Sequence, residues 1–143
     1  MSASRAELEA AYLRTQYCAR LARGEVILRI GAYDEAADRR LRAEAGVRAH
    51  WAILTPCNPQ SQLLTAEDNA ARLARLARRL AEARIRVLPS LNRDPQGAWP
   101  DEDGFFLCDP PAGAAQSLGR EFDQNAIVVG ELGQPPRLVW LRD

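Results

Sequence analysis

The sequence predicts a single α+β domain over residues 1–143, in which three or four helices pack on a mixed, mostly antiparallel sheet of five to seven strands. Strand and helix patterns alternate through the middle of the chain. Each end carries a pair of strand patterns joined by a short turn, which forces antiparallel pairing. No internal repeat, low-complexity segment or Gly/Ser-rich linker divides the chain. A length of 143 residues is also that of one ordinary domain, which buries about two-thirds of its unfolded surface.

The composition is that of a globular protein with no bias towards one charge. Hydrophobic residues make up 47% and charged residues 27% of the chain, and 19 arginines balance 19 acids. A net charge of zero disfavours nucleic acid and anionic membranes as partners. The three cysteines are far apart with no Cys-x-x-Cys spacing, which argues against a disulfide framework and a thiolate metal site. The chain shows no signal peptide and no membrane-spanning run, so a cytoplasmic location is expected.

The first part of the chain predicts a helix, a hairpin and a second helix. A capping pattern that starts at Ser4 opens the first helix. Residues 15–21 and 25–30 have the pattern of two strands, and the three-residue turn between them ends in glycine, as in a bulged hairpin. Asp34 is placed to cap the second helix, which Gly46 ends.

The middle of the chain predicts a strand over 49–55, a polar loop over 56–64 and a long helix over 65–84. Thr65 begins a capping pattern with acids in the first turn, which suits the positive end of the helix dipole. At 100° per residue, one face of the helix carries the leucines that are expected to reach the core: Leu73, Leu76 and Leu80.

Arginines interleaved with acids occupy the adjoining face of this helix. Asp68 and Arg72, and likewise Arg78 and Glu82, are four positions apart and are expected to pair. A solvated, self-paired face is therefore favoured over a stripe that binds nucleic acid.

The last part of the chain predicts one further helix and the remaining strands. In order, these are a strand over 85–91, a polar and acidic loop over 92–104, a strand over 105–108, a helix from Pro110 to near Phe122, and a hairpin of 125–131 with 137–141.

Side-chain amides interrupt apolar contexts at three places. Asn69 lies on the leucine face of the long helix, where a buried amide without partners costs about 1–3 kcal/mol. We expect it to bind the backbone of the 56–64 loop, either as a brace or as one wall of a pocket. Because buried amides seek one another or backbone, the Asn58 loop, Asn69 and the Gln124-Asn125 turn are predicted to meet in space.

Known catalytic and metal-binding patterns do not fit. The 56–64 loop has no glycine, which excludes a phosphate-binding loop or a dinucleotide fingerprint. His50 and Cys57 stand at opposite ends of a strand, roughly 20 Å apart, which excludes a dyad. The segment 92–103 begins with Asn and ends with Asp, unlike a calcium loop, and its Asp94-Pro95-Gln96-Gly97 stretch has the residues of a type I turn. No metal and no cofactor are expected.

The order of several short motifs resembles a known family. The motifs are Ala11-Tyr12, Thr15-Gln16-Tyr17, Thr55-Pro56-Cys57-Asn58-Pro59 with Ser61, Asn69 with Arg72, Gly97-Ala98-Trp99, and Phe122-Asp123-Gln124-Asn125-Ala126-Ile127-Val128. Together they are similar to the bacterial family catalogued as domain of unknown function 3293, from about Ala11 to Trp140. The chain departs from the family pattern with Pro56 in place of Ala and Asp123 in place of Gly. The resemblance implies no activity, but it implies that Thr55, Asn58, Asn69, Arg72, Gln124 and Asn125 belong to one constellation.

Three functions compete for this constellation. The favoured one is a non-enzymatic binding or regulatory module that holds a small polar or anionic ligand, or a protein partner, with Arg72 near a helix amino terminus as an anion clamp. The second is a small enzyme, a hydrolase or transferase acting on an anionic metabolite, which is disfavoured because no general base is evident. The third is a structural polar core with an interaction surface elsewhere. The candidate ligand-binding residues are Thr55, Asn58, Ser61, Asn69, Arg72, Gln124 and Asn125.

Overall fold

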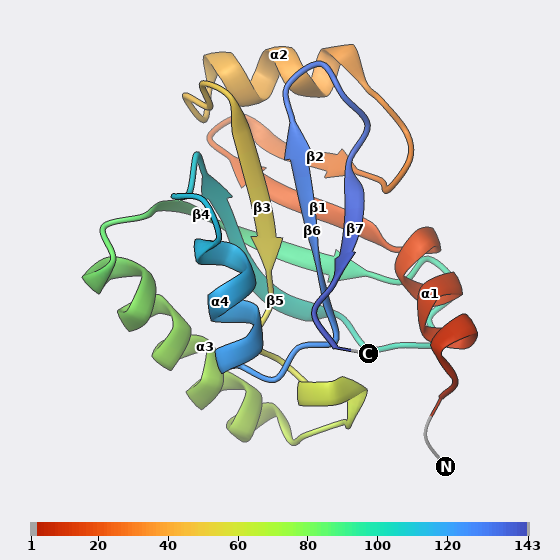
Figure 1. Ribbon diagram of the computed structural model, residues 1–143. Helices are drawn as coiled ribbons and strands as arrows, with labels where there is room; N and C mark the ends of the chain where they lie inside the picture. Colours follow the sequence, from red (N-terminus) through yellow and green to blue (C-terminus); the bar gives the residue numbers. More distant parts are fainter. Residues whose placement is uncertain (1–2, 143) are drawn as a thin grey trace.

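The computed structural model describes residues 3–142 and confirms the α+β fold (Figure 1). The elements follow in the order α1 (Arg5–Arg14), β1 (Gln16–Leu21), β2 (Gly24–Leu28), α2 (Glu35–Ala43), β3 (His50–Leu54), the short 3-10 helix η1 (Pro59–Ser61), α3 (Ala66–Glu82), β4 (Arg86–Arg93), β5 (Glu102–Cys108), α4 (Ala114–Glu121), β6 (Ala126–Glu131) and β7 (Arg137–Trp140).

The seven strands form one sheet in the order β2-β1-β4-β5-β3-β6-β7, and each of these neighbouring pairs is antiparallel. Strand β5 lies between β3 and β4, and β3 lies between β5 and β6, so the helical connections through α3 and α4 each skip one strand. This is the connectivity of a ferredoxin-like β-α-β-β-α-β unit. Strands β1 and β2 extend one edge of that unit, and β7 extends the other.

Helices α3 and α4 cover one face of the sheet (Figure 1). Their apolar faces bury Leu76 and Leu80 of α3 and Leu118 of α4, and Phe122 follows directly after α4. The predicted packing of the long helix is thus confirmed, although Leu73 is only half-buried. Burial of each of these side chains contributes roughly 1.5–3 kcal/mol.

The sheet curls around a second core on its other face. This core combines residues of β1, β2 and α2 with inward-facing residues of β3, β5 and β6. The curl is closed at one end, where Gly31 N, just past β2, donates to Pro136 O, just before β7 (2.7 Å). Helix α1 packs against β7, with the rings of Tyr12 and Trp140 edge to face at 5.6 Å. The inner face is therefore enclosed by the sheet, α1 and α2.

Local sequence signals explain most of the element boundaries. The side chains of Ser4, Asp34 and Thr65 each accept a hydrogen bond from a backbone N–H in the first turn of their helix, as predicted. In the first hairpin, by contrast, Leu21 pairs directly with Gly24, so the turn has two residues and not three. Gly24 has φ +108°, a conformation open to glycine, and thereby joins the strand.

Strand β5 also begins earlier than predicted, at Glu102 rather than at 105. Its extra residues are held by pairing with β4, where Asn92 lies opposite Glu102. The predicted polar loop of 92–104 is therefore much shorter. This correction matters because it places Glu102 on a strand.

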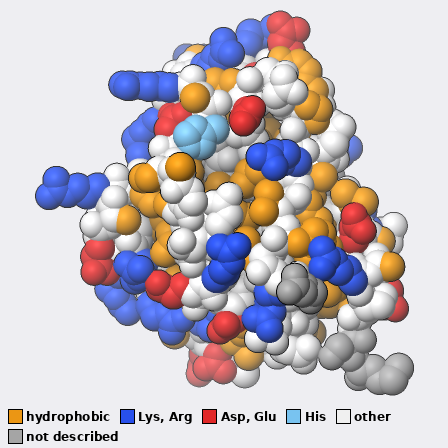
Figure 2. All heavy atoms as spheres, viewed as in Figure 1, with side chains coloured by type: hydrophobic (Ala, Val, Ile, Leu, Met, Phe, Trp, Pro, Cys, Tyr) orange, Lys and Arg blue, Asp and Glu red, His pale blue; other side chains and the backbone are white. Residues whose placement is uncertain are grey.

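Arginine and acidic side chains alternate over the surface seen in Figure 2. The expected pairs of Asp68 with Arg72 and of Arg78 with Glu82 do not form within residues 3–142. Arg79 pairs instead with Glu121 of α4 at 2.8 Å. No helix in that part of the chain has both the length and the apolar character needed to cross a membrane.

Candidate functional site

The loop after β3 is closed by a reciprocal pair of amides. Asn58 N donates to Asn69 Oδ1 (3.0 Å), and Asn69 Nδ2 donates to Asn58 Oδ1 (2.9 Å). The same Asn58 oxygen accepts from Leu64 N (2.9 Å). Asn58 holds φ +48°, a left-handed conformation that asparagine tolerates better than most residues. Asn69 thus binds the loop, as predicted, and fixes where the Asn58 side chain points.

Arg72 joins this loop to the end of α4. Its Nε donates to Pro56 O (2.6 Å), and its Nη2 donates to Phe122 O. Burial lowers the pKa of its guanidinium, and the neighbouring Arg75 lowers it further. Because two of its nitrogens are taken up by backbone carbonyls, Arg72 acts as a brace rather than as an open fork for an anion.

The Gln124-Asn125 turn docks on the same loop. Gln124 Nε2 donates to Cys57 O (3.0 Å), and Asn125 Nδ2 donates to Ser61 Oγ (2.9 Å). Asp123, which stands where the family pattern has glycine, adopts φ +56° and keeps the left-handed turn. The predicted meeting of the three amide-rich spots is therefore confirmed.

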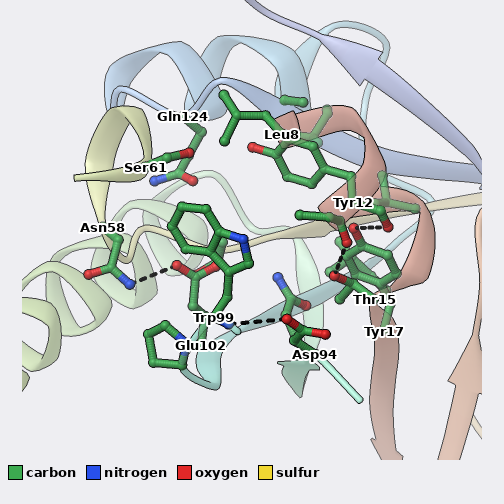
Figure 3. A pocket seen from close by; sticks show the side chains of 18 residues that line it. Leu8, Tyr12, Thr15, Tyr17, Asn58, Ser61, Asp94, Trp99, Glu102 and Gln124 are labelled. Carbon is green, nitrogen blue, oxygen red and sulfur yellow. Dashed lines mark hydrogen bonds between the residues drawn. The ribbon is translucent and has the colours of Figure 1, made fainter. Parts of the chain in front are cut away.

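A cavity of about 80 Å³ lies beside this network, at the end of the inner face that α1 covers. Polar and aromatic side chains of α1, the loop after β3, the β4–β5 connection, β5 and the turn before β6 contribute to its lining, among them Tyr12, Asn58, Ser61, Trp99, Glu102 and Gln124. In Figure 3, Tyr12 extends from α1 with its hydroxyl towards Ser61 and Gln124. Side chains that are far apart in sequence thus converge on one partly open cavity.

The predicted site residues divide into two groups. Thr55, Asn58, Ser61 and Gln124 line the cavity, whereas Asn69, Arg72 and Asn125 do not. The latter three hold the loop and the turn in place through the bonds described above. Thr55 has both roles, because its Oγ1 donates to Asp103 O (2.8 Å) and accepts from Cys57 N (3.1 Å).

Sequence reasoning missed Glu102. Its Oε2 accepts from Asn58 Nδ2 (2.8 Å; Figure 3). Burial raises the pKa of this carboxyl to about 7, and the bond from Asn58 only partly opposes the shift. The acidic run Asp101-Glu102-Asp103 has the composition of a solvated loop. The signal that could have found it is the two-residue period from Phe106 back to Glu102, since alternate residues of a strand share a face.

A second carboxylate next to the cavity is fully occupied by the protein. Asp94 accepts from Arg14 Nε and Nη2 (3.0 Å each) and from the backbone N–H groups of Gln96, Ala98 and Trp99. The Arg14 guanidinium is the main reason why the pKa of Asp94 lies well below its usual range. Gly97 N also donates to Asp94 O (2.9 Å), which confirms the predicted turn. Asp94 therefore anchors the loop that carries Trp99.

The tyrosines of the cavity stay neutral at physiological pH. Burial raises the pKa of Tyr12 to about 12, and the negative charge of Glu102 contributes to the rise. Burial raises the pKa of Tyr17 even more, and its hydroxyl donates to Tyr12 O (3.0 Å). Glu102 is thus the group of this cavity whose charge changes near neutral pH.

His50 and Cys57, which were weighed as a catalytic dyad, do not line the cavity. His50 Nε2 lies 2.7 Å from Pro110 O, and its Nδ1 lies 4.0 Å from Asp109. Burial raises the pKa of the Cys57 thiol, which disfavours a reactive thiolate. Within residues 3–142, no group of three or more His, Cys, Asp or Glu side chains is arranged to hold a metal ion.

Comparison with known proteins gives one match. A family model described as "Protein of unknown function (DUF3293)" matches residues 54–127, which include the loop, α3, β4, β5, α4 and the turn before β6. No curated protein and no solved structure matches the chain.

Proposed function

The chain belongs to the DUF3293 family, and from its site we propose that it binds a small molecule in the cavity between α1, the loop after β3 and β5. The observation that carries this proposal is the convergence of Tyr12, Asn58, Trp99, Glu102 and Gln124 on one partly open cavity. A concave site with a few convergent polar groups and a titratable residue of shifted pKa is the usual form of a ligand site.

A purely structural polar core explains less of this arrangement. The bonds of Asn69, Arg72 and Asn125 have an evident structural purpose, since each ties the loop to a neighbouring element. Glu102 also ties the loop to β5 through Asn58, but a neutral amide would do the same, whereas a half-buried carboxylate weakens the folded state when it ionises. A ligand that compensates the charge of Glu102 would explain why a carboxylate occupies this position.

The second candidate is an enzyme that uses the same cavity. The observation in its favour is the carboxyl of Glu102, whose pKa of about 7 is in the range in which glutamates serve as general bases or acids. The sequence offered no such group, which was the main argument against a hydrolase or transferase. A regulatory role, a bacterial origin and a cytoplasmic location stay predictions.

A thermal-shift screen of small metabolites tests the proposal. A ligand of the cavity should raise the melting temperature (Tm) of the wild type and lose most of that effect in Glu102→Gln and Tyr12→Phe. Glu9→Gln is the matched control, because Glu9 is exposed on α1 and its replacement changes the net charge equally. Equal shifts in all four proteins would place binding outside the cavity. Conversion of a bound ligand into product by the wild type, but not by Glu102→Gln, would favour the enzyme.

A further inference from the structure

We infer that the ligand of this cavity presents a small organic cation, a guanidinium or ammonium head group, to Glu102. This inference rests on the proposed function and adds the chemical class of the ligand. It differs from the anionic ligand that the sequence left open beside a polar ligand or a protein partner, because the charged side chains that line the cavity are carboxylates.

The charge of the cavity is the first argument. Among the residues that the structure describes, the lining includes two carboxylates, Asp94 and Glu102, but no arginine or histidine. Asp94 is already neutralised by the two bonds from Arg14. Glu102 has only the amide of Asn58 as a hydrogen-bond donor. An anion entering the cavity would meet an uncompensated negative charge, whereas a cation would compensate it.

The hydrogen bonds are the second argument. Two of the amide donors at the cavity are already used inside the protein, since Asn58 Nδ2 binds Glu102 and Gln124 Nε2 binds two carbonyls. Within residues 3–142, the buried Asn92 Oδ1 at the cavity has no hydrogen-bond partner. The bonds of Glu102 and Gln124 use Oε2 and Nε2, not Oε1. The cavity therefore offers acceptor oxygens to a ligand that donates N–H groups, which guanidinium and ammonium do.

The shape of the site fits the same class. Tyr12 and Trp99 supply aromatic surface, and an aromatic face attracts a nearby cation by about 0.5–2 kcal/mol. The volume of about 80 Å³ is roughly half of the ~150 Å³ of an engineered cavity that admits benzene. It thus accommodates a head group of a few heavy atoms. Pro100, which also lines the cavity, is exposed and marks the side from which the rest of a larger ligand would extend.

Binding of a cation should depend on pH through Glu102. The titratable groups whose charges are coupled to it are Tyr12 on α1, Tyr17 on β1 and Cys57 in the loop after β3, and all three have raised pKa values and are neutral near pH 7. The pair of Arg14 and Asp94 stays charged and compensated. A cation that binds the ionised carboxylate should therefore bind about tenfold more weakly for each pH unit below 7 and reach a plateau above it.

Three probes of nearly equal size but different charge test the inference: methylguanidinium, N-methylurea and acetate. The readout is the indole N–H signal of Trp99 in a ¹H–¹⁵N NMR spectrum, assigned with Trp99→Phe. The chain has three tryptophans, and the signals of Trp51 and Trp140 report whether a variant keeps its fold. At pH 8 we expect methylguanidinium to shift the Trp99 signal and to bind at least about tenfold more tightly than N-methylurea. In Glu102→Gln this preference should fall close to one, whereas Asp101→Asn, an exposed acid one position away, should retain it.

Failures of the two proposals can be told apart. If N-methylurea or acetate moves the Trp99 signal at least as readily as methylguanidinium does, the cation is the wrong class, while the cavity remains a ligand site. If the affinity of each probe, methylguanidinium included, is the same at pH 5 as at pH 8, Glu102 does not take part and the inference is overturned. If none of them moves the Trp99 signal at its highest soluble concentration, both this inference and the proposed function fail.

Discussion

Replacement of Glu102 by glutamine should stabilise the empty protein at alkaline pH. In the folded state, burial raises the pKa of this carboxyl from 4.5 to about 7. An acid whose pKa is higher in the folded state binds more protons there, so its contribution to stability is present below pH 4.5 and is lost as the pH rises through about 7. Glutamine keeps the acceptor for Asn58 Nδ2 but carries no charge, so it avoids this loss.

The size of the effect follows from the pKa values. A pKa shift from 4.5 to about 7 means that ionised Glu102 lowers the free energy of unfolding by on the order of 3 kcal/mol, once the carboxyl is ionised in both the folded and the unfolded state. For a domain of this length, that difference moves Tm by roughly 6–12 °C. Glu102→Gln and the wild type should therefore differ little at pH 5, and the variant should be the more stable protein at pH 8.

Urea unfolding at both pH values, followed by circular dichroism, measures this difference. Glu9→Gln is the control, because it removes an exposed acid from α1 and should behave as the wild type at both pH values. If Glu102→Gln is no more stable than the wild type at pH 8, Glu102 is not a desolvated carboxylate. The reasoning from burial to ligand would then be refuted.

Three further variants test the network around the cavity. Arg72→Lys should lower the free energy of unfolding by about 1–3 kcal/mol in urea unfolding, because a single ammonium cannot reach both Pro56 O and Phe122 O as the fork does; unchanged stability would show that the brace is dispensable. Asp94→Asn should lower Tm by more than about 5 °C at pH 7 and broaden the indole signal of Trp99, because it weakens the pair with Arg14 and the turn. The loss of stability should vanish below the pH at which wild-type Asp94 takes up a proton, which lies well under the usual pKa of an aspartate. A sharp, unshifted Trp99 signal would contradict the anchoring role. Gly130→Ala should cost about 1–3 kcal/mol in the same urea assay, because a Cβ at this position collides with the ring of Trp51 in the core; full stability would mean that the ring moves aside freely.

Local patterns in the sequence predicted much of the fold. The caps at Ser4, Asp34 and Thr65 depend on a side chain and a backbone group a few residues away, so they are visible in the sequence. The order of the strands depends on long-range pairing. The extension of β5 back to Glu102 is of this kind, because pairing with Asn92 of β4 decides it and no nearby residue does.

The candidate site was predicted in part for the same reason. An amide on an apolar face of an element requires hydrogen-bond partners when it is buried, which is why Asn58 and Asn69 could be predicted to lie together. The role of Arg72 could not be seen, because its partners Pro56 O and Phe122 O are backbone atoms that any sequence possesses. Glu102 was missed because its importance comes from its burial in a cavity that also needs α1 and the loop after β3, both of which are far from it in the sequence.

The most direct test of Glu102 as the ligand-binding group is a ¹³C NMR titration of its carboxyl carbon in the free protein and in the presence of saturating methylguanidinium. The free protein should show a carboxyl with a pKa of about 7, as burial requires, and the bound cation should lower that pKa because it favours the ionised form. A carboxyl that titrates at the ordinary pKa of glutamate, with no response to methylguanidinium, would contradict both the desolvated state of Glu102 and its role in binding.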